Sequence, residues 1–205
     1  MVATDGHRMA CVARDLSAEV QPTQERDLLI PPTALKHVCD IFLPDDQLEI
    51  TLTDNHITFQ STTQSVTTRL ISGSYPNYEQ ILPKKANHDT VIDRSEFAAA
   101  LRRVIAIAPE KSHCTKLSFT LNLLTVSVQT PDSGEASDEV TVSWDQEPFD
   151  IGVNTQYLLD ILRHIPGEAI RFKCNAAEQA MVIEAAEWPT GLSGLFLLMP
   201  IRLNN

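Results

Sequence analysis

The stretch VATDGHRMA, residues 2–10, places a carboxylate, an imidazole and a guanidinium close together in Asp5, His7 and Arg8. An aspartate and a histidine could form a nucleophilic triad with a distant serine. The same Asp-Gly pair is also the usual two-residue turn of a β-hairpin. The sequence contains no Gly-rich phosphate loop, G-x-S-x-G elbow or H-E-x-x-H motif. These residues therefore favour a turn or a ligand-binding edge over a catalytic cluster, and no enzyme activity is expected.

Composition limits the classes of partner. The chain has 205 residues, enough for one large or two small domains, and a formal net charge of -11. DNA repels such a protein at long range, which argues against tight DNA binding by its whole surface. No apolar run approaches the roughly 18–20 residues of a membrane span, and no signal peptide opens the sequence.

The cysteines indicate a compartment rather than a site. Cys11, Cys39, Cys114 and Cys174 are scattered and form no metal-binding spacing with a histidine. Free, buried thiols in a reducing cytoplasm are therefore expected. Neither a metal nor another cofactor is expected.

A long internal repeat organises the chain. IPPTALKHVCDIFLPDDQLEI (residues 30–50) and VNTQYLLDILRHIPGEAIRF (residues 153–172) align without gaps when Pro44 is matched with Pro166. Each copy predicts a short amphipathic helix, a turn with proline and an acid, and a strand of alternating apolar residues. A repeat period this long indicates a duplicated domain rather than a solenoid.

Start signals predict three helices. In the two copies of the repeat, Thr33 and Asn154 are the candidate N-caps. Between the copies, residues 98–107 predict another helix, capped by Asp93 or Ser95. Strands are expected near residues 48–52, 57–61, 66–71, 116–119, 123–129, 139–144, 169–174, 180–185 and 194–200. The polar segment 130–139 is expected to be a flexible loop.

The repeat predicts two domains, residues 1–88 and residues 89–205. Relative to the second, the first would lack about 30 residues and one helix, so the chain is expected to begin inside its first domain. An incomplete domain of this kind would expose an unpaired strand edge and an apolar face.

Four stretches carry a family resemblance. VATDGHRMA, SGSYPNYEQILPK (residues 72–84), VNTQYLLDIL (residues 153–162) and LLMPIRL (residues 197–203) resemble signature stretches of the bacterial beta sliding clamp, the processivity subunit of DNA polymerase III. The stretches occur in family order over essentially the whole chain. The resemblance implies an α+β DNA-clamp fold of repeated helix-plus-antiparallel-sheet domains. In that plan, two subunits form a ring around duplex DNA, with helices inside and sheets outside. This chain would supply one partial middle domain and one complete last domain.

The resemblance also implies a cleft for short peptides. In the family, polymerases, the clamp loader and repair proteins carry a glutamine followed by apolar residues ending in Leu-Phe, and this segment enters a cleft between the middle and last domains. The matching residues are Thr4, Gly6, His7, Arg8, Met9, Pro76, Gln80, Ile81, Asn154, Tyr157, Leu197, Met199, Pro200, Ile201, Arg202 and Leu203. Two features depart from the family pattern. Gln80 stands where arginine is common, and Asn204 and Asn205 extend past the usual terminal leucine.

A second implied surface is basic. Lys36, Arg102, Arg103 and Arg163 lie on the predicted helices and would face DNA in a clamp. Such contacts would be weak, independent of sequence and sensitive to salt. The alternative for these residues is an ordinary solvated helix face.

The sequence leads to one function and two alternatives. The first is a non-catalytic processivity factor that binds clamp-motif peptides of DNA polymerase III, the clamp loader and repair proteins and slides on duplex DNA. It would assemble as a homo-oligomer or with a full-length clamp subunit. One alternative is a truncated regulatory or decoy module that binds the same peptides but cannot close a ring. The other is a gene fragment with little function.

Overall fold

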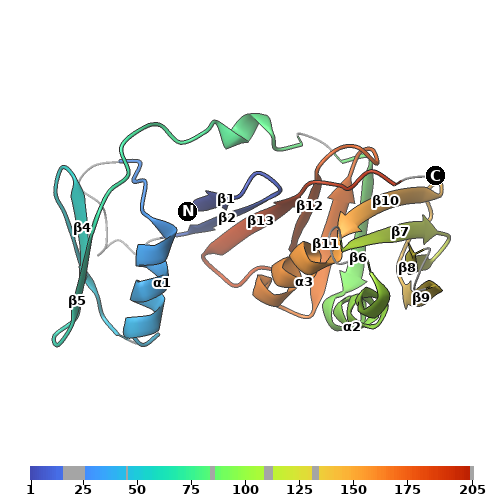
Figure 1. The fold of residues 1–205 in the computed structure, drawn as a ribbon, viewed down its shortest axis with the longest axis horizontal. Coiled ribbons are helices and arrows are strands. Elements are labelled where there is room, and N and C mark those ends of the chain that lie inside the picture. Colours follow the sequence, from blue (N-terminus) through green and yellow to red (C-terminus); the bar gives the residue numbers. More distant parts are fainter. Residues whose placement is uncertain (16–25, 45, 84–85, 109–112, 131–133, 204–205) are drawn as a thin grey trace. The chain divides into compact units, whose positions relative to one another are not determined.

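The computed structural model describes residues 1–15, 26–44, 46–83, 86–108, 113–130 and 134–203, and it divides the chain into two compact units (Figure 1). The larger unit comprises Met1–Glu19 and Glu79–Asn205, and the smaller unit comprises Val20–Tyr78. All strand pairs in both units are antiparallel, so the described chain has the predicted α+β class. The division into domains at residue 88 stays a prediction.

A six-stranded sheet forms one side of the larger unit. Its order is β1 (Val2–Thr4), β2 (Arg8–Arg14), β13 (Leu192–Leu198), β12 (Met181–Ala185), β11 (Ala169–Cys174) and β6 (His88–Asp93). The β2–β13 register places Met9 opposite Leu197. Two segments from opposite ends of the sequence therefore lie side by side in one sheet (Figure 1).

A second sheet and two helices complete the larger unit. The sheet order is β10 (Phe149–Asn154), β7 (Cys114–Thr120), β8 (Leu123–Thr130) and β9 (Gly134–Thr141). Helices α2 (Arg94–Val104) and α3 (Thr155–His164) contact each other and strands of both sheets, and a short 3-10 helix, η3 (Ile105–Ile107), follows α2. Apolar side chains from all these layers share one core, in which Phe97, Phe119, Trp144 and Phe172 have no exposed surface. Burial of apolar area on this scale is the main stabilising contribution.

The smaller unit has one helix and one sheet. Helix α1 (Pro32–Ile41) accompanies a sheet of β3 (Glu49–Leu52), β4 (His56–Gln60) and β5 (Ser65–Arg69). Its core contains three buried apolar side chains, Phe42, Ile57 and Phe59, with partly buried neighbours. The residues of a second short 3-10 helix, η2 (Tyr78–Gln80), are divided between the two units.

The predicted caps of the larger unit are confirmed. The Asn154 side chain accepts a hydrogen bond from the backbone N–H of Tyr157 at the start of α3. Of the two candidates for α2, Asp93 is the cap, because its carboxylate accepts the backbone N–H of Glu96 at 2.8 Å. Each cap satisfies a backbone donor that the first helical turn leaves without a partner.

The predicted cap of α1 is wrong. Thr33 lies inside α1, which begins at Pro32 with Pro31 in the cap position and no side-chain cap bond. Proline suits the first helical residue because its φ is already helical and its missing N–H is not needed there. Pro32 therefore corresponds to Thr155, and the helices of the two repeats are one residue out of step with the gapless alignment.

The expected loop at residues 130–139 is wrong over most of its length. Residues 134–139 belong to β9, which pairs with β8 and places Ala136, Asp138 and Val140 on its less exposed face. The polar composition that predicts a loop fits an outer strand with one solvated face equally well. Residues 131–133 lie outside the described residues. Strands β6 and β10 were not predicted.

None of the four cysteines forms a disulfide, but only Cys174 is buried, while Cys11 and Cys114 are partly buried and Cys39 is exposed. The expectation of buried thiols is therefore wrong for three of the four. Burial raises the pKa of Cys174 to about 12. Within the described ranges, the helices are too short or too polar to cross a bilayer. The same ranges contain no cluster of three or more histidine, cysteine or acidic side chains that could hold a metal.

Candidate functional site

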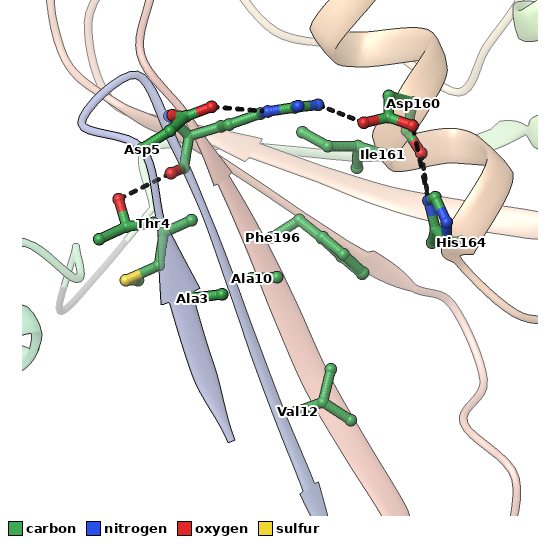
Figure 2. A pocket seen from close by; sticks show the side chains of 11 residues that line it. Ala3, Thr4, Asp5, Ala10, Val12, Asp160, Ile161, His164 and Phe196 are labelled. Atoms are coloured by element: carbon green, nitrogen blue, oxygen red, sulfur yellow. Dashed lines mark hydrogen bonds and ion pairs between the residues drawn. The ribbon is translucent and has the colours of Figure 1, made fainter. Parts of the chain in front are cut away.

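A pocket of about 510 Å³ opens in the larger unit beside the β1–β2 hairpin. Its lining residues are Ala3, Thr4, Asp5, Arg8, Met9, Ala10, Val12, Asp160, Ile161, His164 and Phe196. In Figure 2, Ala3, Ala10 and Phe196 lie along the floor, Val12 lies at one end, and charged side chains lie at the other. Ligand pockets are commonly about 300–1,000 Å³ and mostly apolar, so this one suits a small apolar group.

The sequence TDGHR forms the hairpin turn at the charged end. Gly6 has a φ of 87°, a backbone conformation that glycine adopts without strain. The Asp5 carboxylate accepts the backbone N–H groups of His7 and Arg8, both at 3.0 Å. The Thr4 hydroxyl donates to the carbonyl oxygen of Arg8 at 2.8 Å. Side-chain bonds of this kind hold a turn in one geometry.

Arg8 links this turn to helix α3. Its guanidinium forms ion pairs with Asp5, at 3.1 Å, and with Asp160 of α3, and lies 4.6 Å from the centre of the Tyr157 ring (Figure 2 shows the two ion pairs). The His7 ring stacks on the same tyrosine with 6.2 Å between ring centres. A cation over an aromatic face and a pair of charge-assisted bonds fix one wall of the pocket.

The network also perturbs the titration of its members. Partial burial alone would raise the pKa of Asp5, but the N–H groups of His7 and Arg8 and the Arg8 guanidinium outweigh it, so the pKa lies below its ordinary value. Burial alone would lower the pKa of Arg8, but Asp5 and Asp160 raise it. Both groups therefore stay charged at neutral pH, and the rim of the pocket is polar.

The C-terminal segment is held at both ends by backbone bonds. The Met199 N–H donates to the carbonyl oxygen of His7 at 2.9 Å, and the Ile201 N–H donates to Gly152 of β10 at 2.8 Å. A Cβ on Gly152 would stand 2.3 Å from the carbonyl oxygen of Ile201. The segment can approach β10 this closely because glycine has no side chain.

The structure brings a minority of the predicted cleft residues to this pocket and leaves most of them apart. Thr4, Arg8 and Met9 line the pocket. His7 and Tyr157 adjoin it through their ring contact, and Asn154 positions α3 as its cap. The residues that are not among its lining are Gly6, Gln80, Ile81, Leu197, Met199, Pro200, Ile201, Arg202 and Leu203. Pro76 belongs to the smaller unit. The tail Asn204–Asn205 lies outside the described residues.

Several lining residues were not predicted, notably Asp160, Ile161 and His164 on α3. Together with Tyr157 they are spaced three, four and seven residues along the helix, which places them on one face. That spacing could have identified them once Tyr157 was assigned to the site. The signal for Phe196 is weaker, since only the β2–β13 register places it opposite Ala10.

The predicted DNA-facing residues are exposed. Arg102 of α2 and Arg163 of α3 form no ion pair within the described residues, and their helices are in contact. Arg103 pairs with Asp138 of β9, which reduces its net positive field. Lys36 is exposed on α1 of the smaller unit.

Known proteins resemble both parts of the chain. The family model for the central domain of the DNA polymerase III beta subunit matches residues 1–77. The family model for the C-terminal domain of the same subunit matches residues 79–191. The beta sliding clamp of Pseudomonas aeruginosa is 28% identical over 203 residues, covering 98% of this chain and 54% of the relative. That of Caulobacter vibrioides is 28% identical over 204 residues, covering 98% and 53%.

Solved structures of sliding clamps resemble this chain as well. A sliding clamp from Pseudomonas aeruginosa has a TM-score of 0.89 at 28% identity and covers 98% of this chain and 55% of that one. The DNA polymerase III subunit beta of Bartonella birtlesii, bound to griselimycin, has a TM-score of 0.88 at 28% identity and covers 98% and 54%. The chain thus spans about half the length of the relatives it matches. From the two domain matches and the shared α+β clamp fold, we conclude that this chain belongs to the DNA polymerase III beta subunit family.

Proposed function

We propose that this chain is a non-catalytic component of a DNA polymerase sliding clamp, acting in the cytoplasm, and that its pocket binds clamp-motif peptides. The supporting observation is the apolar pocket of about 510 Å³ between the TDGHR turn and α3. The peptide ligand is a glutamine followed by apolar residues ending in Leu-Phe. Its aromatic end would enter over Ala10 and Phe196, and its polar groups would meet the rim formed by Thr4 and Arg8.

The lining supports a ligand that varies in sequence. Met9 lines the pocket, and methionine adapts to apolar groups of different shape. The rim is already organised by the Asp5–Arg8–Asp160 ion pairs, so binding orders few additional side chains. Such a site suits the peptides of DNA polymerase III, the clamp loader and repair proteins, which share a motif but differ around it.

Contact with duplex DNA is the second part of the proposal. Arg102 and Arg163 are exposed on adjacent helices, while the whole chain carries a net charge of -11. Their contacts with phosphates would be few and independent of sequence. Binding should therefore be weak and should fall with salt, as suits a protein that slides.

The test is a titration of a fluorescently labelled clamp-motif peptide, read by anisotropy. We expect saturable binding with a Kd of about 1 µM. Ala3 is an exposed residue that lines the pocket, so Ala3→Trp should fill the pocket without disturbing the core and weaken binding at least about tenfold. Ala13 is an exposed alanine of the same hairpin outside the pocket, so Ala13→Trp is the matched control and should bind as the unchanged chain does.

Two results would contradict the proposal. One is absence of peptide binding by a chain whose circular dichroism shows that it is folded. The other is equal loss in both tryptophan variants, which would place the peptide elsewhere on the hairpin. Griselimycin, held by the clamp from Bartonella birtlesii, should compete with the peptide if both use this pocket.

A further inference from the structure

The tip of the β1–β2 hairpin extends past the backbone ladder that anchors it. The pairing of β2 with β13 ends at Arg8. One further backbone bond, from the Met199 N–H to the carbonyl oxygen of His7, reaches the turn. Within the part of the chain that the structure describes, the hydrogen bonds of Asp5 and Gly6 stay inside the turn. The position of the TDGHR turn relative to helix α3 therefore depends on side chains.

Two consecutive side chains of the turn reach one face of α3. The Arg8 guanidinium lies 4.6 Å from the centre of the Tyr157 ring and pairs with Asp160, while the His7 ring stacks on the same tyrosine. Tyr157 and Asp160 are three residues apart in the helix, which places them on one face. The turn lies in the part of the chain that matches the central domain of the family, and α3 lies in the part that matches the C-terminal domain. These contacts therefore join two domains.

Two carboxylates share the Arg8 guanidinium. Asp5, in the same turn, binds its Nε at 3.1 Å, whereas Asp160, in α3, binds Nη1. Among the described residues, Arg8 is the one side chain that hydrogen-bonds the Asp160 carboxylate, because the nearby His164 ring bonds the backbone carbonyl of Asp160 instead. Both ion pairs are partly exposed, so each adds little to stability. Asp160 nevertheless decides the direction of a long side chain, since without it the guanidinium would keep only its partner in the turn.

We propose that Asp160 is a positioning residue of the peptide pocket. It holds Arg8 over Tyr157 and so places the TDGHR turn against α3 in the arrangement that receives the peptide. The inference rests on the proposed function and goes beyond it, because it assigns the position of the rim to a residue of the other domain that acts through Arg8. The contribution of Arg8 to peptide affinity should then depend on Asp160.

The first measurement is the affinity of the labelled clamp-motif peptide for the variant Asp160→Asn, read by anisotropy. The amide has nearly the shape of the carboxylate but no charge, so we expect about fivefold weaker binding. Asp160→Glu keeps the charge and should bind within about twofold of the unchanged chain. The matched control, Asp138→Asn, breaks the ion pair with Arg103 elsewhere in the larger unit and makes the same change in net charge. It should bind the peptide normally.

A double-mutant cycle shows whether Asp160 acts through Arg8. Arg8→Gln alone should weaken binding, and adding Asp160→Asn should weaken it further by less than about twofold. If the two effects multiply, the proposal is overturned, because Asp160 then acts independently of Arg8. Unchanged binding in Asp160→Asn, or an equal loss in Asp138→Asn, would overturn it as well.

An NMR measurement without peptide separates this proposal from that of the pocket. The Arg8 Nε–H signal and the His7 ring signals report the position of the turn, because both groups lie against the Tyr157 ring. They should shift in Asp160→Asn and return in Asp160→Glu. Signals that stay in place in Asp160→Asn would overturn the inference even if the unchanged chain binds the peptide. Signals that shift in a chain that binds no peptide would support the role of Asp160 in holding Arg8 and overturn the proposed function.

Discussion

The larger and smaller units contain the same repeat, a helix followed by an antiparallel sheet, but they bury it to different extents. In the larger unit, two sheets and two helices enclose side chains such as Phe172, which has no exposed surface. In the smaller unit, the equivalent Ile50 is 59% exposed, and a single helix accompanies three strands. The repeat thus becomes a well-packed layer only where a second helix and sheet cover it. Stability should accordingly be unequal along the chain.

The largest expected effects come from removing one core phenylalanine in each unit. Phe172→Ala should lower the free energy of unfolding by about 3–5 kcal/mol, since it leaves a cavity in a closed core. Phe59→Ala should instead open the smaller unit locally. Both tryptophans, Trp144 and Trp188, lie in the larger unit, so fluorescence during denaturation reports that unit alone. Hydrogen exchange of β4 reports the smaller one.

The comparison fails if Phe59→Ala shifts the tryptophan transition as much as Phe172→Ala does. The two units would then unfold as one cooperative structure. The expected result is faster exchange in β4 and β5 with little change in the fluorescence midpoint.

Helix caps provide a smaller test. Asp93→Ala and Asn154→Ala each remove a side-chain cap in the larger unit and should cost about 1 kcal/mol. Pro31 caps α1 without a side-chain bond, so Pro31→Ala should change stability by less than about 0.5 kcal/mol. Thermal unfolding of the three variants measures the difference. A loss at Pro31 equal to that at Asp93 would contradict it.

The smallest expected effect is the pH dependence of stability that Asp5 causes at the rim of the pocket. The pKa of Asp5 lies below its ordinary value of 3.8, so its ionised form favours the folded hairpin. This stabilisation is present above about pH 4 and is lost as pH falls through the lowered pKa. A carboxyl titration by NMR should give a midpoint below 3.8 for Asp5. Arg8→Gln should move it upward, and a midpoint unaffected by that change would remove Arg8 as a cause.

Much of the fold could be predicted because its signals are local. The alternating apolar residues of β11 and the cap at Asn154 are visible in the sequence alone. Most of β9 was predicted as a loop because Glu135, Asp138 and Glu139 make it as polar as one, and only its end overlaps the strand expected near residues 139–144. Its pairing with β8 makes the polar part a strand. The start of α1 was misplaced by one residue because Thr33 is a good cap and Pro32 is a better first helical residue.

The candidate site likewise contains some residues that the sequence predicted and others that it did not. Thr4, Arg8 and Met9 were identified by family resemblance, and they do line the pocket. Asp160 and Phe196 were not, because their place depends on how α3 and β13 meet the hairpin from distant parts of the chain. Resemblance supplies residues whose identity matters to a ligand. It does not supply the residues that hold those side chains in position.

Gly152 of β10 shows how a residue outside the pocket can be as intolerant of substitution as a residue that contacts the ligand. Its side of β10 is closed by the Ile201 backbone, so the position admits only glycine. Any side chain there would push the C-terminal segment away from β10 and strain the bond between Met199 and His7. A residue that contributes no side chain to the pocket would then behave genetically as part of the binding site. Loss of peptide binding in such a variant would report on backbone spacing, not on a lost ligand contact.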